Sequence, residues 1–205
     1  MQGVYACHVA YHPVVPKLWT ATIDAHRREV RDAVLDATAA LVAEHGLLSV
    51  TMSGVAEAAG IGRATLYKYF TDVEAILAAW HERQVSGHLA QLQAIRDQPG
   101  QPHQRLRAVL EAYAVITHES RHEHDGDIVA SLHRDRHVAD AERHLHEMVT
   151  RLLADAATAG EIRADMQPDE LATFCLNALT AARRLPTKAA VQRLLAVTLG
   201  ALDPT

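Results

Sequence analysis

Apolar residues recur three or four positions apart along almost all of this 205-residue chain. Val30, Val34, Ala37 and Leu41 form the first such stripe, and the spacing persists as far as Leu202. Side chains three or four positions apart lie on one face of an α-helix, whereas a half-buried strand needs alternation with a period of two. No stretch alternates for long enough to indicate a strand. The pattern therefore predicts an all-α fold with about nine helices.

The composition supports this fold class and limits the function classes. Aromatic residues make up only 4% of the chain, so the core must consist mainly of Ala, Leu and Val, whereas a β-sandwich would need more β-branched and aromatic side chains. The net charge of −5 argues against a protein coated in basic surface but leaves room for a local basic patch. Cys7 and Cys175 form neither a CxxC motif nor a disulfide framework, and we expect a reducing, cytoplasmic location.

Three segments with different patterns divide the chain. Residues 1–16 carry two prolines and no charged side chain, and we expect a flexible leader there, not a signal peptide or a membrane span. A first domain is expected over 17–72, and a second domain with longer amphipathic helices over 73–205. Thr71 and Glu74 have the spacing of a capping box, which predicts that a long helix begins where the two domains meet.

Residues 51–70 have the pattern of two short helices joined by a tight turn. Thr51 is a good N-cap for the first helix, and Gly60 permits a sharp turn that few other residues allow. Ile61 and Leu66 are placed to pack the two helices over a shared apolar patch. The segment therefore predicts a helix-turn-helix.

The second helix of this segment carries the local basic patch. No acidic residue occurs from 58 to 71, whereas Arg63 and Lys68 are both basic. The alternative is a helical hairpin of an unrelated bundle, in which the tyrosines pack in a core and Arg63 is merely solvated. Gly60 and Gly62 do not form a dinucleotide-binding loop, because a third glycine and a preceding strand are lacking.

These residues resemble the TetR family of bacterial transcriptional regulators. The resemblance is strong over about residues 25–88, and beyond them only the overall length and the last two helices fit. It is carried by the helix 28–44 with His45-Gly46 behind it, by Thr51-Met52, by Val55-Ala56 and above all by the run 59–70.

The resemblance implies a three-helix DNA-binding domain and a long fourth helix that leads into a six-helix body. That body would bind a small-molecule effector and form a homodimer through helices at 169–183 and 187–202. The protein would then be a ligand-responsive regulator, a repressor released from an inverted-repeat operator, with no catalytic residue and no cofactor. The residues expected to contact phosphates are Thr51, Thr65, Tyr67 and Lys68, and those nearest the base edges are Arg63, Ala64 and Tyr69.

One position departs from the family pattern. The family usually has a lysine at the start of the fourth helix, where this chain has Val73. The missing phosphate contact must come from another cation, and Lys17, Arg27, Arg28 and Arg31 are the candidates in and ahead of the first helix. An adaptor protein that has lost DNA binding is an alternative for which Val73 is the only hint.

The body offers fewer signals for its ligand. We expect an aliphatic or moderately polar organic effector, in a pocket lined by Trp80, Tyr113, His118 and Leu132.

The residues 118–146 are rich in histidine, with i, i+4 pairs at His118/His122 and His133/His137. A metal-sensing regulator is therefore an alternative. Nearby arginines oppose a metal ion, however, and we assign no metal ligand. A metal-dependent hydrolase is a further alternative, although no nucleophile or matched acid–base pair supports it.

Overall fold

The computed structural model describes residues 17–120 and 136–204 and consists, over these residues, of helices without a strand. The all-α prediction is confirmed. Eight α-helices are described, and the leader expected at 1–16 lies outside the described residues. The elements in chain order are α1 (Lys17–His45), η1 (Leu47–Ser49), α2 (Met52–Ala58), α3 (Arg63–Leu66), α4 (Val73–Arg96), α5 (Pro102–Glu119), α7 (Arg136–Thr158), α8 (Pro168–Thr180), η3 (Ala181–Arg184) and α9 (Lys188–Gly200).

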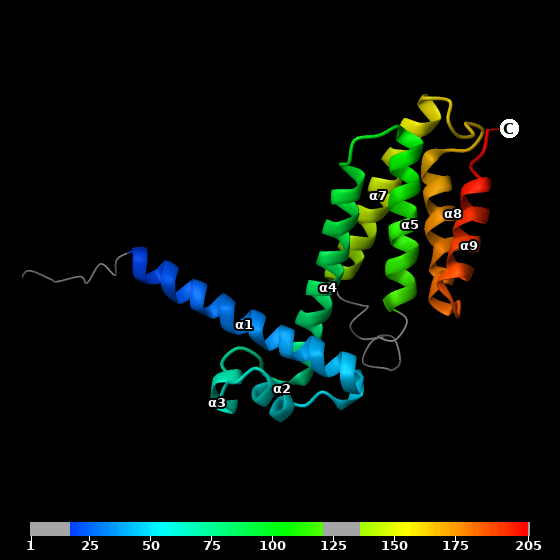
Figure 1. Cartoon of the computed structure of the whole chain (residues 1–205). Helices are drawn as coiled ribbons and strands as arrows, with labels where there is room; N and C mark the ends of the chain where they lie inside the picture. Colours follow the sequence, from blue (N-terminus) through cyan, green and yellow to red (C-terminus); the bar gives the residue numbers. More distant parts are fainter. Residues whose placement is uncertain (1–16, 121–135, 205) are drawn as a thin grey trace, which may run out of the picture.

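The first three helices and the beginning of α4 share one apolar core. Val34 of α1, Val55 of α2 and Leu66 of α3 are completely buried in it, together with Leu77 and Trp80 of α4. Figure 1 shows this small unit below the rest of the molecule, with the N-terminal part of α1 projecting away from it. We call α1–α3 and the start of α4 the N-terminal unit.

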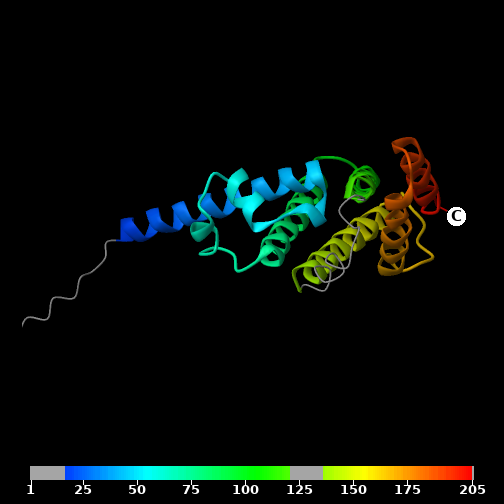
Figure 2. The same cartoon turned by 90° about the horizontal axis from the view of Figure 1, so that it is seen from below.

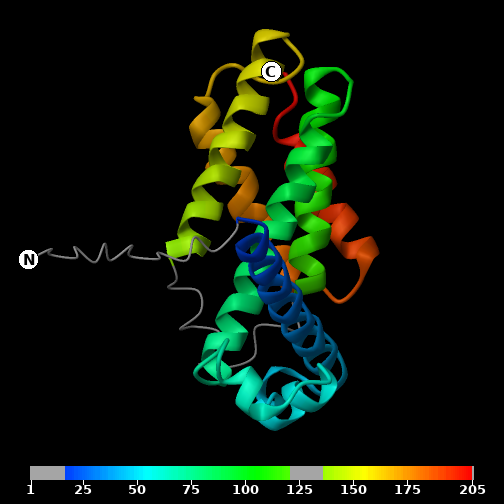
Figure 3. The same cartoon turned by 90° about the vertical axis from the view of Figure 1, so that its left-hand side faces the viewer.

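The remaining helices form a second core. Helix α5 lies at its centre and contacts α4, α7, α8 and α9. Leu110 of α5, Leu153 of α7, Leu179 of α8 and Leu195 of α9 are almost completely buried there, and burying a leucine contributes about 1.5–3 kcal/mol. Figure 2 shows that α8 and α9 lie side by side at the end of this body that is away from the N-terminal unit, and Figure 3 shows the N-terminal unit beneath the body. None of the described helices is long and apolar enough to cross a lipid bilayer.

The start of α4 differs in detail from the capping box predicted for it. Oδ1 of Asp72 accepts a 2.7 Å hydrogen bond from the backbone N–H of Ala75, so Asp72 is the N-cap. The Thr71 hydroxyl donates to Oδ2 of Asp72 at 2.9 Å and so supports the cap without providing it. An aspartate and a threonine are both good N-caps, and the sequence alone does not tell which of two neighbours takes the position.

The start of α9 agrees with the helix expected over 187–202. Thr187 caps α9 by accepting a 3.2 Å hydrogen bond from the N–H of Ala190.

Replacement of Asp72 by Ala should lower the free energy of unfolding by about 1 kcal/mol, because the first turn of α4 loses its side-chain acceptor. Thr71→Ala is the matched control and should cost clearly less, since the hydroxyl of Thr71 donates to the capping carboxylate and does not itself cap a backbone N–H of α4. Urea denaturation of both variants measures the difference. Equal losses would show that the cap is shared by the two side chains.

Candidate nucleic-acid interface and ligand cavity

The segment 51–70 folds as a helix-turn-helix. The side chain of Thr51 caps α2 by accepting a 3.1 Å hydrogen bond from the N–H of Gly54. The backbone of Gly60 has φ +67°, the left-handed conformation that glycine adopts without strain. The N–H of Ile61 then donates to the carbonyl of Ala56 at 3.0 Å, which closes the turn. The chain reverses in this turn and enters α3.

The outward side of α3 and the turns that follow it carry the residues expected to contact DNA. Hydrogen-bonded turns extend α3 through residue 70. Leu66 and Phe70 point into the core and are buried. The other side chains of residues 63–69 therefore lie at or near the surface. Arg63, Ala64, Tyr67 and Lys68 are exposed, as is Thr51 at the start of α2, whereas Thr65 and Tyr69 are half-buried.

A cationic groove lies between α1 and the end of the helix-turn-helix. We give this name to the hollow of about 480 Å³ lined by Arg27, Arg28, Arg31, Lys68 and Tyr69. The guanidinium of Arg31 lies 4.9 Å from the centre of the Phe70 ring, which holds the two segments together. Among the described residues, none of the four cations forms an ion pair. The groove therefore presents an uncompensated positive charge beside α3.

The three arginines of the groove are those that the sequence named as substitutes for a cation at position 73. The structure brings them next to Lys68, while the side chain of Lys17 lies outside the described residues. Val73 itself is half-buried and packs against the core of the N-terminal unit.

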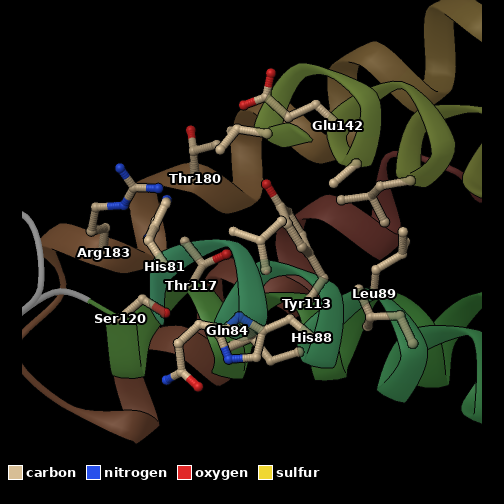
Figure 4. A pocket seen from close by; sticks show the side chains of 16 residues that line it. His81, Gln84, His88, Leu89, Tyr113, Thr117, Ser120, Glu142, Thr180 and Arg183 are labelled. Atoms are coloured by element: carbon tan, nitrogen blue, oxygen red, sulfur yellow. The ribbon is translucent and has the colours of Figure 1, made fainter. Parts of the chain in front are cut away.

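A second cavity, of about 390 Å³, lies in the body between α4, α5, α7 and the α8–η3 junction (Figure 4). We call it the ligand cavity. One part of its wall is aliphatic and includes Val85, Leu89, Leu92, Ile116 and Leu145. The polar part includes His88, Tyr113, Glu142, Thr180 and Arg183.

Burial shifts the pKa of two groups that line the cavity. Burial raises the pKa of Tyr113 above its ordinary value, an effect that the nearby Glu142 adds to and that Thr117 and Arg183 oppose. Burial also lowers the pKa of His88, against a smaller opposing effect of Glu119. Near neutral pH the cavity therefore contains a neutral phenol and a neutral imidazole.

The four residues expected in the effector pocket are found in different places. Tyr113 lines the ligand cavity. Trp80 packs into the N-terminal unit, because its position on α4 faces α1. His118 is buried, with Nδ1 3.1 Å from the carbonyl oxygen of Ala182, and it joins α5 to η3 without lining the cavity. Leu132 lies outside the described residues.

Sequence reasoning missed Thr180 and Arg183. Thr180 is the last residue of α8 and Arg183 lies in the 3-10 turn η3 that follows it, and no sequence pattern showed that the chain turns there toward α5. The only available signal was that the helical spacing of apolar residues ends near Ala182.

The histidine-rich region supports no metal centre among the described residues, which contain no group of three His, Cys, Asp or Glu side chains close enough to share an ion. His146 lies 3.1 Å from the hydroxyl of Thr173 and 3.6 Å from the carboxylate of Asp169, and these contacts tie α7 to α8. The side chains of His122, His124, His133 and His137 lie outside the described residues.

Two family models match the chain. The first, for bacterial regulatory proteins of the tetR family, matches residues 34–80, and the second, for the SbtR-like transcriptional regulator C-terminal domain, matches residues 101–204. The second match covers about half of the chain. The protein belongs to the TetR family of bacterial regulators. Its helix-turn-helix is that of a DNA-binding transcriptional regulator, as the resemblance over 25–88 implied.

Individual proteins that are similar to this chain are also described as transcriptional regulators. The HTH-type regulator Rv1255c of Mycobacterium tuberculosis, itself uncharacterized, is 39% identical over 66 residues, which are 32% of this chain and 33% of the relative. The match thus spans a third of the relative's length. The TetR regulator SCO0520 of Streptomyces coelicolor is 26% identical with a TM-score of 0.61, covering 85% of this chain and 99% of that one. A TetR-family regulator of Pectobacterium atrosepticum is 26% identical with a TM-score of 0.67, covering 86% and 92%.

Replacement of Gly60 by Ala should lower the free energy of unfolding by about 1–2 kcal/mol, because an L-residue is strained at φ +67°. No atom lies within 4 Å of the added Cβ, so the loss would come from the backbone alone. Gly62→Ala is the control, since Gly62 has an ordinary φ of −70° and an added Cβ would meet only Thr65, at 4.0 Å. Denaturant unfolding that gave equal losses would contradict this role of Gly60.

Proposed function

We propose that this protein is a ligand-responsive repressor. A homodimer binds an inverted-repeat operator and leaves it when a small molecule occupies the ligand cavity. The observation that carries this proposal is that one helix, α4, belongs both to the core beneath the exposed basic helix-turn-helix and to the wall of the ligand cavity. Such a regulator acts on DNA in the cytoplasm.

The side chains of the helix-turn-helix that we assign to DNA fall into two groups. Arg63 and Ala64 stand at the start of α3, where a recognition helix meets base edges in the major groove, and Tyr69 is assigned with them. Thr51, Thr65, Tyr67 and Lys68 are assigned to phosphates. The exposure of Arg63 and Lys68 supports both assignments.

The cationic groove extends the phosphate-binding surface. Arg27, Arg28 and Arg31 line it together with Lys68, so one strand of the backbone can contact cations from α1 and from the helix-turn-helix. This arrangement supports the proposal that α1 replaces the lysine absent at position 73. Each phosphate contact releases a counterion and makes binding more dependent on salt.

Helix α4 provides a physical route from the cavity to the DNA. Gln84 and His88 of α4 line the ligand cavity. Between them and the N-terminal core, Arg83 binds Asp36 of α1 through a 2.9 Å ion pair. A ligand that displaces α4 would thus move α1 relative to the body. Release by about 100-fold requires about 2.7 kcal/mol of difference between the ligand affinities of the two conformers.

Helices α8 and α9 carry exposed apolar side chains that a homodimer would bury. Phe174 of α8 is 42% exposed and Val197 of α9 is 73% exposed, although both are large apolar side chains on helices that contact each other. A twofold contact through α8 and α9 would cover both side chains and place two recognition helices in successive major grooves.

Arg63→Ala and Arg28→Ala should weaken DNA binding in different ways. Loss of a base contact at Arg63 should cost about 1–3 kcal/mol on the operator and little on unrelated DNA. Loss of a phosphate contact at Arg28 should weaken both and reduce the salt slope by about 1. Fluorescence anisotropy with operator and scrambled duplexes over a salt series measures both quantities. If Arg63→Ala still prefers the operator over the scrambled duplex as strongly as the wild type does, Arg63 does not contact the bases.

Val197→Asp should convert the dimer to a monomer, because a carboxylate would be buried without a partner at the α8–α9 interface. Leu48→Asp is the control, since Leu48 is 70% exposed but lies in η1, far from α8 and α9. Sedimentation velocity should show a monomer only for the Val197 variant. A dimer that survives this substitution would place the interface elsewhere.

A further inference from the structure

Arg183 gives the ligand cavity a fixed positive charge. It is the only Lys or Arg among the described residues that line the cavity, and a guanidinium stays protonated at physiological pH. In the part of the chain that the structure describes, no carboxylate forms an ion pair with Arg183. Arg183 extends from η3 beside Thr180, and Figure 4 shows the hydroxyl end of Tyr113 pointing toward this region.

Among the described residues, the other charged and titratable groups that line the cavity form no ion pair with Arg183. Glu142 approaches from α7 and lines the cavity, but it does not pair with Arg183. Glu119 of α5 acts on His88. His81 and His88 of α4 complete the titratable lining, and burial keeps His88 neutral. The positive and negative charges of the cavity are therefore separated, with Arg183 on η3 and Glu142 on α7.

The cavity is also amphipathic along its length. Figure 4 shows Leu89 at the end opposite Arg183. Leu89, Leu92 and Leu145 form an aliphatic wall, from which water is displaced favourably by an apolar group. A volume of about 390 Å³ lies near the lower end of the usual range of about 300–1,000 Å³ for small-molecule sites, which favours a compact ligand.

We propose that the effector is a small amphipathic carboxylic acid, bound as its anion. The carboxylate accepts hydrogen bonds from the guanidinium of Arg183 and from the hydroxyl of Tyr113, and the apolar body lies against Leu89 and Leu145. Repulsion by Glu142 disfavours other placements of the anion, so the two charges fix the direction of the ligand. The inference rests on the proposed effector role of the cavity.

Charge-matched probes test this assignment. Octanoate and phenylacetate supply the carboxylate, octanamide and phenylacetamide are neutral isosteres, and octylamine and phenethylamine reverse the charge. Calorimetry and thermal shift on the full-length dimer should show binding of at least one acid, with its amide at least 10-fold weaker and its amine without binding. Arg183→Ala should weaken binding of that acid about 10- to 100-fold, and Arg183→Lys less, because Lys keeps the charge but loses the bidentate geometry.

Arg184→Ala is the matched control. Arg184 is the neighbouring arginine of η3 and does not line the ligand cavity, so the variant should bind the acid as the wild type does. Unperturbed melting of the ligand-free variants shows that both are folded. Equal binding of acid and amide, equal losses in the two arginine variants, or no binding of either acid would overturn the anionic assignment.

A separate measurement tests the repressor function independently of the carboxylate assignment. Operator release is followed by anisotropy with the same probes. Release by a neutral or cationic compound that binds in the cavity would support the repressor function and overturn the carboxylate assignment. Acid binding that depends on Arg183 but leaves operator affinity unchanged would support the carboxylate site and contradict its role as the effector site.

Discussion

Helix α4 is buried at its start in one apolar core and at its end in another, and this double burial is the constraint on which the rest of the structure depends. Leu77 and Trp80 are anchored among α1–α3, whereas Leu92 is anchored among the helices of the body. A stiff helix cannot shift at one end without disturbing the packing at the other. The residues between these anchors are the ones that meet the ligand cavity and, through Arg83, helix α1.

The cationic groove and the ligand cavity are proposed to bind different ligands, but in both of them binding depends on local positive charge. In the cationic groove, four cations without ion-pair partners among the described residues gather beside the recognition helix, although the chain as a whole has a net charge of −5. In the ligand cavity, as far as the structure describes its lining, Arg183 is the one cation of a wall that is otherwise partly aliphatic and partly polar. Local charge left unpaired by the fold, and not the overall charge, determines what each surface can bind.

The N-terminal third was largely predictable because its signals are local. Thr51, Gly60 and the basic segment after Gly62 each act through backbone conformation or exposure within a few residues, and the structure places them as the pattern predicts. The N-cap of α4 was misplaced by one residue, because Thr71 and Asp72 are both competent and the choice depends on the direction in which the chain leaves Phe70. Trp80 was expected in the effector pocket, yet it lies on the same face of α4 as Ile76 and Leu77 and is buried with them in the core of the N-terminal unit.

The sequence by itself determined that the chain is helical, roughly where the last helix lies, and that residues 51–70 form a helix-turn-helix, because periodicity, capping and glycine conformation are properties of neighbouring residues. Only the tertiary structure decided which side chains surround the ligand cavity. Tyr113 and Arg183 are 70 positions apart and meet because α5 packs against η3. The same is true of the cationic groove, where α1 and Lys68 come together. Contacts between distant segments depend on how helices rotate and cross, and a single sequence carries no direct record of that packing.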